Sequence, residues 1–156
     1  MDFRLTEEES WGFIAQAQTG ILTTLRRDGR PITLPVWHVA FGHRVYVRTP
    51  ERTSKLARIR RDARASFLVE SGQAWIDLIA VGFNGRAWIE DDQTVIAEAH
   101  RRLDEKYAAF EPPLDQLLPA VAAYYTSPKL IVALEPEGRL STWNNRALLA
   151  PAQASG

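Results

Sequence analysis

The spacing of apolar residues predicts a short opening helix followed by an antiparallel sheet. Thr6 and Glu9 match a capping box, and the helix that they begin is expected to end near Thr19–Gly20. Alternation of apolar and polar positions then predicts three strands, over residues 21–26, 31–39 and 45–48.

The turns between these runs favour a meander of hairpins. Asp28–Gly29 is a strong signal for a two-residue hairpin turn, and Phe41–Gly42–His43 turns the chain a second time. Pro35 lies inside the second run and lacks the N–H that a central strand donates. We therefore expect this run to be an edge strand or to contain a bulge.

The second half of the chain alternates between helices and strands without a regular repeat. Thr49 as N-cap and Pro50 in the first turn predict a helix to about Arg61. Gly82 and Gly85 indicate a bend in a long strand-like run. The remaining elements are expected at 64–70 and 75–90 (strands), 91–107 and 114–125 (helices), and 129–135 and 139–143 (a closing pair of strands).

These elements predict a mainly β fold with peripheral helices. About seven strands and four helices are expected, with the strands joined as hairpins, which disfavours a doubly wound parallel sheet. We predict a small closed or partly open antiparallel β-barrel with the helices outside. One domain is expected over residues 1–148, followed by a flexible tail over 149–156.

Composition narrows the class of protein. The chain has 156 residues, no Cys and a formal net charge of zero, which excludes disulfides and thiolate chemistry and argues against a nucleic-acid binder. No apolar run reaches the length of a membrane span, and the acidic N-terminal sequence does not resemble a signal peptide. A cytoplasmic protein is the expectation.

Several common chemistries lack their motifs. The sequence contains no Gly-x-Gly-x-x-Gly turn, no Walker loop and no Gly-x-Ser-x-Gly elbow. His38, His43 and His100 fall in a strand, a turn and a helix, so they form no metal-binding pair in sequence. No metal site is predicted.

One stretch, residues 48–64, carries a chemical signal. Basic and hydroxyl side chains crowd around the expected start of a helix, where free backbone N–H groups and the helix dipole favour an anion such as phosphate. A solvated basic helix is the alternative interpretation, and nucleic-acid binding is disfavoured because no aromatic residue interleaves the basic ones. The candidate phosphate ligands are Arg48, Thr49, Thr53, Ser54, Lys55 and Arg58.

The order of short motifs along residues 6–148 resembles that of the pyridoxamine 5′-phosphate oxidase-like proteins, the FMN-binding split-barrel family of flavin and deazaflavin oxidoreductases. The resemblance rests on their order and spacing together. The matching pieces are Thr19–Thr24, Asp28–Pro31, Pro35–Trp37, Arg48–Thr49, Thr53–Arg64, Gly85–Ala87 and Ser141–Arg146.

The resemblance implies a split β-barrel of antiparallel Greek-key type and a homodimer with the cofactor in a groove between subunits. It implies that Pro35, Val36 and Trp37 run along the flavin ring, that Arg48–Thr49 and Thr53–Lys55 hold the phosphate, and that the segment from Trp143 to Arg146 closes over the cofactor. Core packing or a dimer contact is the alternative for Trp37 and Trp143.

The sequence also departs from the family pattern. His38 stands where many relatives have an aromatic residue, Ala63 where many have Pro, and Asn144 where an acidic residue is usual. A C-terminal substrate motif for pyridoxamine phosphate is not recognisable, so vitamin B6 synthesis is not assigned. The helix expected over 114–125 is longer than in minimal members and is expected to cover the substrate side.

The function that the resemblance implies is hydride transfer between a bound cofactor and a small organic substrate. FMN is the first candidate cofactor, and coenzyme F420 the alternative, because the Arg residues between 52 and 64 suit an acidic tail. His38, Tyr124 and Tyr125 are candidates for protonating a reduced substrate, although His38 is more simply a barrel residue bonded to the backbone. A flavin, haem or tetrapyrrole carrier or sensor, and a structural dimer with an empty groove, are the competing functions.

Overall fold

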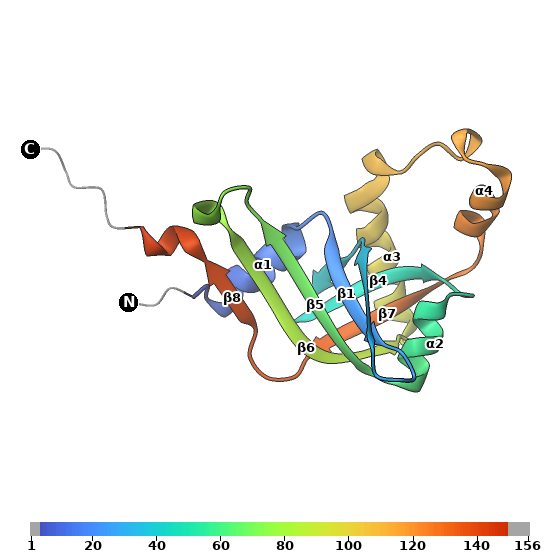
Figure 1. The fold of residues 1–156 in the computed structure, drawn as a ribbon. Helices are drawn as coiled ribbons and strands as arrows, with labels where there is room; N and C mark the ends of the chain where they lie inside the picture. The colour runs from blue at the N-terminus through green and yellow to red at the C-terminus, as the bar shows by residue number, and fades with distance from the viewer. Residues whose placement is uncertain (1–3, 150–156) are drawn as a thin grey trace, which may run out of the picture.

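A computed structural model of the chain describes residues 4–149, and within that range it contains a single antiparallel sheet with helices around it (Figure 1). The helices are α1 (Glu7–Gln16), α2 (Ser54–Arg61), α3 (Gln93–Tyr107) and α4 (Pro119–Thr126). The strands are β1 (Gly20–Leu25), β2 (Pro31–Val36), β3 (Val39–Phe41), β4 (Arg44–Pro50), β5 (Arg64–Ser71), β6 (Ile79–Ile89), β7 (Lys129–Pro136) and β8 (Ser141–Asn144).

The sheet curls into a half-barrel, which confirms the predicted split barrel. Its strand order is β2-β1-β5-β6-β7-β4-β3, and every pairing is antiparallel. The strands β2 and β3 are consecutive in the chain yet lie at opposite ends of this order. The split in the barrel therefore opens where β2 passes to β3.

Two predicted turns are confirmed. Gly29 in the β1–β2 hairpin has φ 81°, and Gly42 and His43 between β3 and β4 have φ 58° and 57°. These left-handed angles are those that a tight hairpin turn requires, and glycine adopts them at no steric cost. Pro35 lies in β2, an end strand of the sheet, as its missing N–H predicted.

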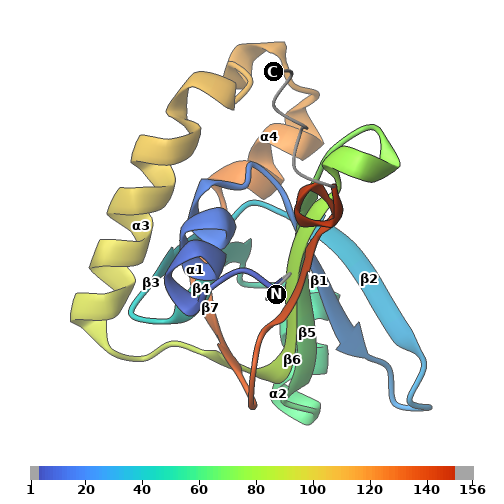
Figure 2. The ribbon, with the colours of Figure 1, turned by 90° about the vertical axis from the view of Figure 1, so that its left-hand side faces the viewer.

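The helices close the barrel and cover one of its faces. The capping box of Thr6 and Glu9 begins α1, whose Ile14 is fully buried in the barrel core with Leu56 of α2. A second apolar cluster packs α3 on the other face of β3, β4 and β7 through Leu103 and Tyr107. Figure 2 shows α1 between α3 and the wall formed by β5 and β6.

Close approaches of the backbone explain the glycines of β6. A Cβ built on Gly85 would lie 1.9 Å from the carbonyl oxygen of Glu135, and one on Gly82 would lie 3.0 Å from that of Phe67. The strand β6 pairs with β5 along one edge, and with both β7 and β8 along the other. The bend that the two glycines predicted is therefore the place where β6 passes from one partner to the next.

Three predicted boundaries and one predicted strand pairing were wrong. The run 31–39 is two strands, because the chain leaves β2 at Trp37. The first helix ends at Gln16, before Gly20 opens β1. The run 75–90 begins with a 3₁₀ turn, Trp75–Asp77. The strands β7 and β8 do not pair with each other, because β8 returns along β6.

The predicted start of the second helix was also wrong, and its correction matters for the site. Thr49 and Pro50 are the last residues of β4, where they pair with Leu130 and Lys129 of β7. The helix begins at Ser54 with Thr53 as N-cap. Strand pairing outweighs the local Thr-Pro preference here. The predicted helix over 114–125 is shorter, a 3₁₀ turn (Leu114–Gln116) followed by α4. Most of the predicted tail, residues 150–156, lies outside the described residues.

Candidate functional site

A cavity of about 800 Å³ lies where the barrel is split. Its volume falls within the range of small-molecule sites. One side is the end of β2 with the residues that follow it, and the opposite side is the chain between α3 and β7. The predicted ring-contacting residues Pro35, Val36 and Trp37 all line it, together with Arg48 and Pro50 of β4.

Trp37 is held in place by α3. Its indole stacks on the ring of Tyr107 with centroids 4.4 Å apart and an angle of 4° between the ring planes, and 37% of the residue remains exposed. The Tyr107 hydroxyl accepts from the His38 N–H at 2.9 Å and lies 2.9 Å from the carbonyl oxygens of Gln18 and His38. Burial raises the pKa of Tyr107, so this hydroxyl keeps its proton and donates.

Lys106 also binds the chain around Trp37 to α3. Its ammonium donates to the carbonyls of Ala15, Ala17 and His38 at 3.0, 2.7 and 2.9 Å. Burial lowers the pKa of Lys106 to about 8. The end of α1 and the link between β2 and β3 are thus tied to the C-terminal turn of α3.

His38 does not line the cavity. Its ring is fully buried, with Nε2 2.7 Å from the carbonyl oxygen of Ile14 and the edge of the Phe67 ring nearby. Burial lowers its pKa to about 4, so the imidazole is neutral at pH 7 and donates from Nε2. This placement favours the structural interpretation of His38 over the catalytic one. Tyr125 lines the cavity, whereas Tyr124 does not.

Arg48 and Thr49 point to opposite faces of β4, because successive side chains of a strand alternate. The Arg48 guanidinium turns toward α3 and pairs with Asp104 at 2.6 Å and with Glu111 at 3.5 Å. His100 Nδ1 lies 3.5 Å from it, and burial together with Arg48 lowers the pKa of His100. The charge of Arg48 is therefore already compensated.

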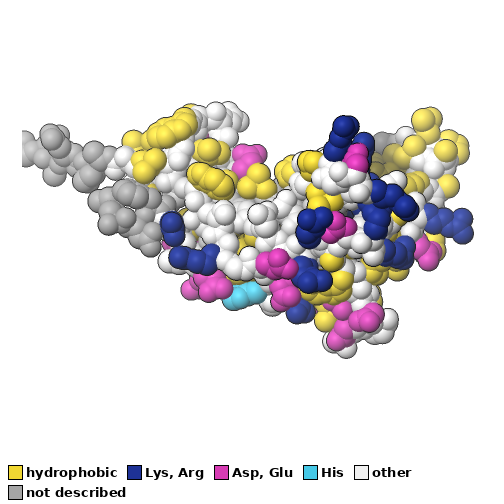
Figure 3. All heavy atoms as spheres, turned by 60° about the horizontal axis from the view of Figure 1, so that its bottom comes forward, with side chains coloured by type: hydrophobic (Ala, Val, Ile, Leu, Met, Phe, Trp, Pro, Cys, Tyr) yellow, Lys and Arg dark blue, Asp and Glu magenta, His cyan; other side chains and the backbone are white. Residues whose placement is uncertain are grey.

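Thr49 faces the start of α2 and a second group of polar side chains. Lys55 Nζ donates to Thr49 Oγ1 at 3.5 Å, and Arg58 Nε donates to Thr24 Oγ1 at 2.8 Å. Thr53 Oγ1 is buried without a hydrogen-bond partner. We call these five residues the α2 cluster. Figure 3 shows Lys and Arg side chains gathered over this part of the molecule, in its right-hand half.

The electrostatics of the α2 cluster favour an anion. Among residues 4–149, no ion pair joins Lys55 or Arg58 to a carboxylate. Burial and the neighbouring Arg58 lower the pKa of Lys55, and burial, Arg26 and Arg61 lower that of Arg58. A bound anion would relieve this repulsion. The Thr53 side chain does not cap the first N–H groups of α2, so these donors are left for an anion.

Trp143 and Arg146 are not brought to the cavity of their own chain. Trp143 is the third residue of β8 and is 51% exposed, and Arg146 follows it in a 3₁₀ turn, Asn145–Leu148. Asn145 donates to the Trp75 carbonyl at 2.6 Å and fixes this turn. In Figure 1 the β8 end and α4 lie at opposite ends of the molecule.

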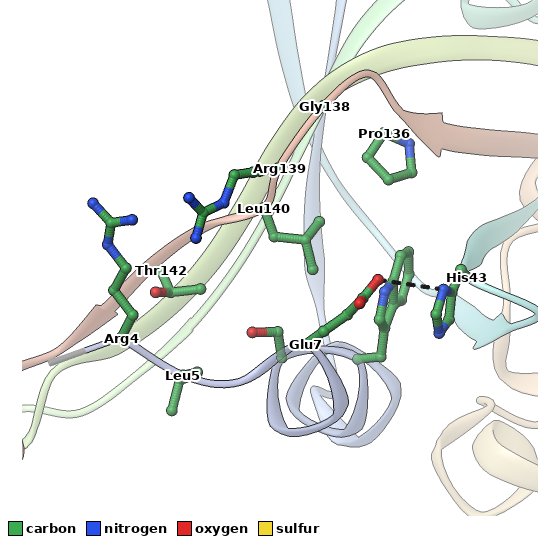
Figure 4. Close-up of a pocket in the computed structure, with 11 residues that line it drawn as sticks. Arg4, Leu5, Glu7, His43, Pro136, Gly138, Arg139, Leu140 and Thr142 are labelled. Carbon is green, nitrogen blue, oxygen red and sulfur yellow. Dashed lines mark ion pairs between the residues drawn. The ribbon is translucent and has the colours of Figure 1, made fainter. Parts of the chain in front are cut away.

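A second cavity, of about 330 Å³, lies between α1 and the loop that joins β7 to β8 (Figure 4). Trp11, Arg139 and Thr142 help to line it, and His43 pairs with Glu7 at 3.6 Å on its rim. None of the predicted site residues is among its lining. Elsewhere, residues 4–149 hold no group of three or more His, Asp or Glu placed to bind a metal, and no helix in this range has the length and apolar character to span a membrane.

Sequence reasoning missed the α3 contribution to the site. Tyr107 is the last residue of the helix expected over 91–107, and its hydroxyl was the available signal for a role beyond helix packing. Asp104 and Glu111 carried no signal, because their partner Arg48 is 56 residues from Asp104 in sequence.

The sequence pattern of the family described as pyridoxamine 5′-phosphate oxidase matches residues 6–137, and the chain belongs to this family. Among curated proteins, none matches the chain significantly. The family includes oxidoreductases and haem-binding storage proteins.

Solved structures share the fold. A conserved hypothetical protein of Mycobacterium tuberculosis is 24% identical, with a TM-score of 0.79 over 99% of this chain and 94% of its own. An FAD-binding protein of Mesorhizobium loti is 17% identical, with a TM-score of 0.66 over 88% and 94%. The haem storage protein of Vibrio cholerae is 17% identical, with a TM-score of 0.65 over 92% and 96%.

Proposed function

We propose that the chain is an oxidoreductase that holds FMN in the 800 Å³ cavity and transfers hydride between the flavin and a small organic substrate. The observation that carries the proposal is the α2 cluster, where two cations without acidic partners among residues 4–149 and an unpaired buried hydroxyl lie near Thr49, the residue of β4 between Arg48 and Pro50 of the cavity lining. Membership of a family that binds flavin or haem supports it.

The residues of the chain bind and orient the cofactor in this proposal. Lys55, Arg58, Thr49 and Thr53 hold the phosphate, together with the N–H groups at Ser54 and the start of α2. Pro35, Val36 and Trp37 lie along the ring. When bound, FMN supplies the hydride acceptor and donor, so the protein contributes orientation and electrostatics.

Two copies of the chain are proposed to share each site. Trp143 and Arg146 lie away from the cavity of their own chain, so they reach a cofactor only from a second copy. The apolar side chains exposed near β8 include Trp75, Trp143 and Leu148, at 68%, 51% and 48% exposure. Exposed apolar patches of this kind are typical of protein interfaces. Figure 3 shows apolar side chains at this end, on the left.

Coenzyme F420 is the alternative cofactor, because Arg52, Arg60 and Arg61 extend the positive charge beyond the phosphate site. A haem or tetrapyrrole carrier is the second candidate function. The observation in its favour is His100, which lines the cavity and whose lowered pKa keeps a neutral ring available as a metal ligand.

Absorbance titration of the purified protein with FMN, F420 and haemin in turn tests the proposal. We expect saturable binding of FMN, followed by reduction with a hydride donor and reoxidation by an acceptor over many cycles. Saturable F420 binding with weak FMN binding would move the assignment to the deazaflavin. A haem spectrum with no flavin binding, or bound flavin that does not turn over, would contradict the oxidoreductase.

A further inference from the structure

The wall of the cavity opposite Trp37 is formed by a segment whose apolar side chains are exposed to solvent. We call residues 108–126, from the end of α3 through α4, the roof segment. None of the residues of α4 is buried. Phe110, Leu114 and Tyr125 of the roof segment line the cavity and are 60%, 52% and 51% exposed.

Large apolar side chains that converge on one cavity favour an apolar ligand. Leaving their surface in water is unfavourable in proportion to its area, and a bound apolar molecule removes that surface from water. Trp37, which is proposed to lie along the flavin ring, bounds the other side of the cavity, and its stacking on Tyr107 fixes its orientation. A planar substrate ring fits between a flavin held there and the roof segment.

The charges that line the cavity cancel. Arg48 is paired with Asp104 and Glu111, while the Lys129 ammonium donates to the Tyr125 carbonyl. The lining thus carries two cations and two carboxylates, so its net charge is zero, and burial lowers the pKa of His100, which leaves that ring neutral at pH 7. Lys55 and Arg58 of the α2 cluster lie outside this lining, and the cofactor phosphate is proposed to bind there.

We propose that the substrate of this site is a neutral, largely apolar, planar ring compound, bound against the roof segment. This inference rests on the proposed function, since it names what the bound flavin reacts with. It disfavours a substrate that carries its own phosphate, such as pyridoxamine 5′-phosphate, because the lining has no net positive charge to balance a dianion.

Equilibrium dialysis with two probes tests the proposal, on the protein both with and without FMN. The probes are menadione, a neutral bicyclic quinone, and pyridoxal 5′-phosphate, a small phosphorylated ring. The variants are Leu114→Ser, which places a polar group in the cavity wall, and Leu118→Ser. Leu118 is 73% exposed in the same segment and does not line the cavity, so it is the matched control.

We expect menadione to bind the wild type more tightly than pyridoxal 5′-phosphate. Leu114→Ser should weaken menadione binding about ten-fold, because part of a buried leucine contact is lost. Leu118→Ser should leave the binding of both menadione and FMN unchanged. Tighter binding of the phosphorylated ring, no menadione binding, or equal effects of the two variants would overturn the inference. Failure of FMN to bind, with menadione binding intact, would instead overturn the proposed function alone.

Discussion

At the scale of single residues, His38 shows how burial decides protonation. The ring lies in the barrel core, where a positive charge is costly, and its pKa falls from 6.5 to about 4. At pH 7 the imidazole is neutral in both the folded and unfolded chain, so it adds no pH dependence there. As the pH falls below 6.5 the unfolded chain takes up a proton that the folded chain refuses, and stability decreases until about pH 4.

We therefore predict that the free energy of unfolding falls by about 2 kcal/mol between pH 7 and pH 5 on account of His38. Urea unfolding at several pH values measures this slope. In His38→Gln the slope over this range should largely disappear, whatever the stability of the variant at pH 7. An unchanged slope in His38→Gln would show that another group is responsible.

We do not expect catalysis to require the side chain of His38. The ring does not line the cavity, so a His38→Phe variant that folds should reduce and reoxidise bound flavin at the wild-type rate. Stopped-flow absorbance at saturating donor is the measurement. A large loss of rate in a variant with normal flavin affinity would return His38 to the mechanism.

At the scale of elements, β6 organises the sheet because three strands pair with it. Gly85 lies where β7 crosses, and a side chain there has no room beside the Glu135 carbonyl. We predict that Gly85→Ala costs at least about 3 kcal/mol of stability. Gly12 in α1 has open space around its Cβ position, so Gly12→Ala should stabilise by about 0.5–1 kcal/mol. Thermal unfolding of both variants tests the pair, and similar melting temperatures would contradict it.

Some features of the helices and strands could be predicted from the sequence, and others could not. Hairpins at Asp28–Gly29 and Gly42–His43 were predictable, since local turn chemistry determines them. The boundary at Thr49–Pro50 was not, because pairing of β4 with β7 depends on a strand about 80 residues later.

The sequence likewise predicted some features of the site and not others. Pro35, Val36 and Trp37 line the cavity as the family resemblance implied, whereas the turn of Arg48 toward Asp104 and Glu111 follows from where α3 packs.

At the scale of the whole molecule, β8 and α4 lie at opposite ends (Figure 1), and α4 contributes Tyr125 to the cavity while Trp143 belongs to β8. A dimer resolves this separation. Light scattering should give twice the chain mass of 17.6 kDa, and Trp143→Glu should shift the protein toward the monomer and weaken FMN binding together. Leu118→Glu, an equally drastic change on the roof segment, should remain dimeric. A wild-type monomer that binds FMN tightly would contradict the shared site.

The central claim is that the α2 cluster holds the phosphate of a flavin whose ring lies in the cavity. Calorimetric titration of the wild type and of Lys55→Ala with FMN and with riboflavin, which lacks the phosphate, tests it most directly. We predict that the wild type binds FMN about 100-fold more tightly than riboflavin. Lys55→Ala should lose most of that difference while binding riboflavin as the wild type does, and Arg60→Ala, an exposed cation on the same helix, should keep it. Equal wild-type affinities for FMN and riboflavin would contradict the claim.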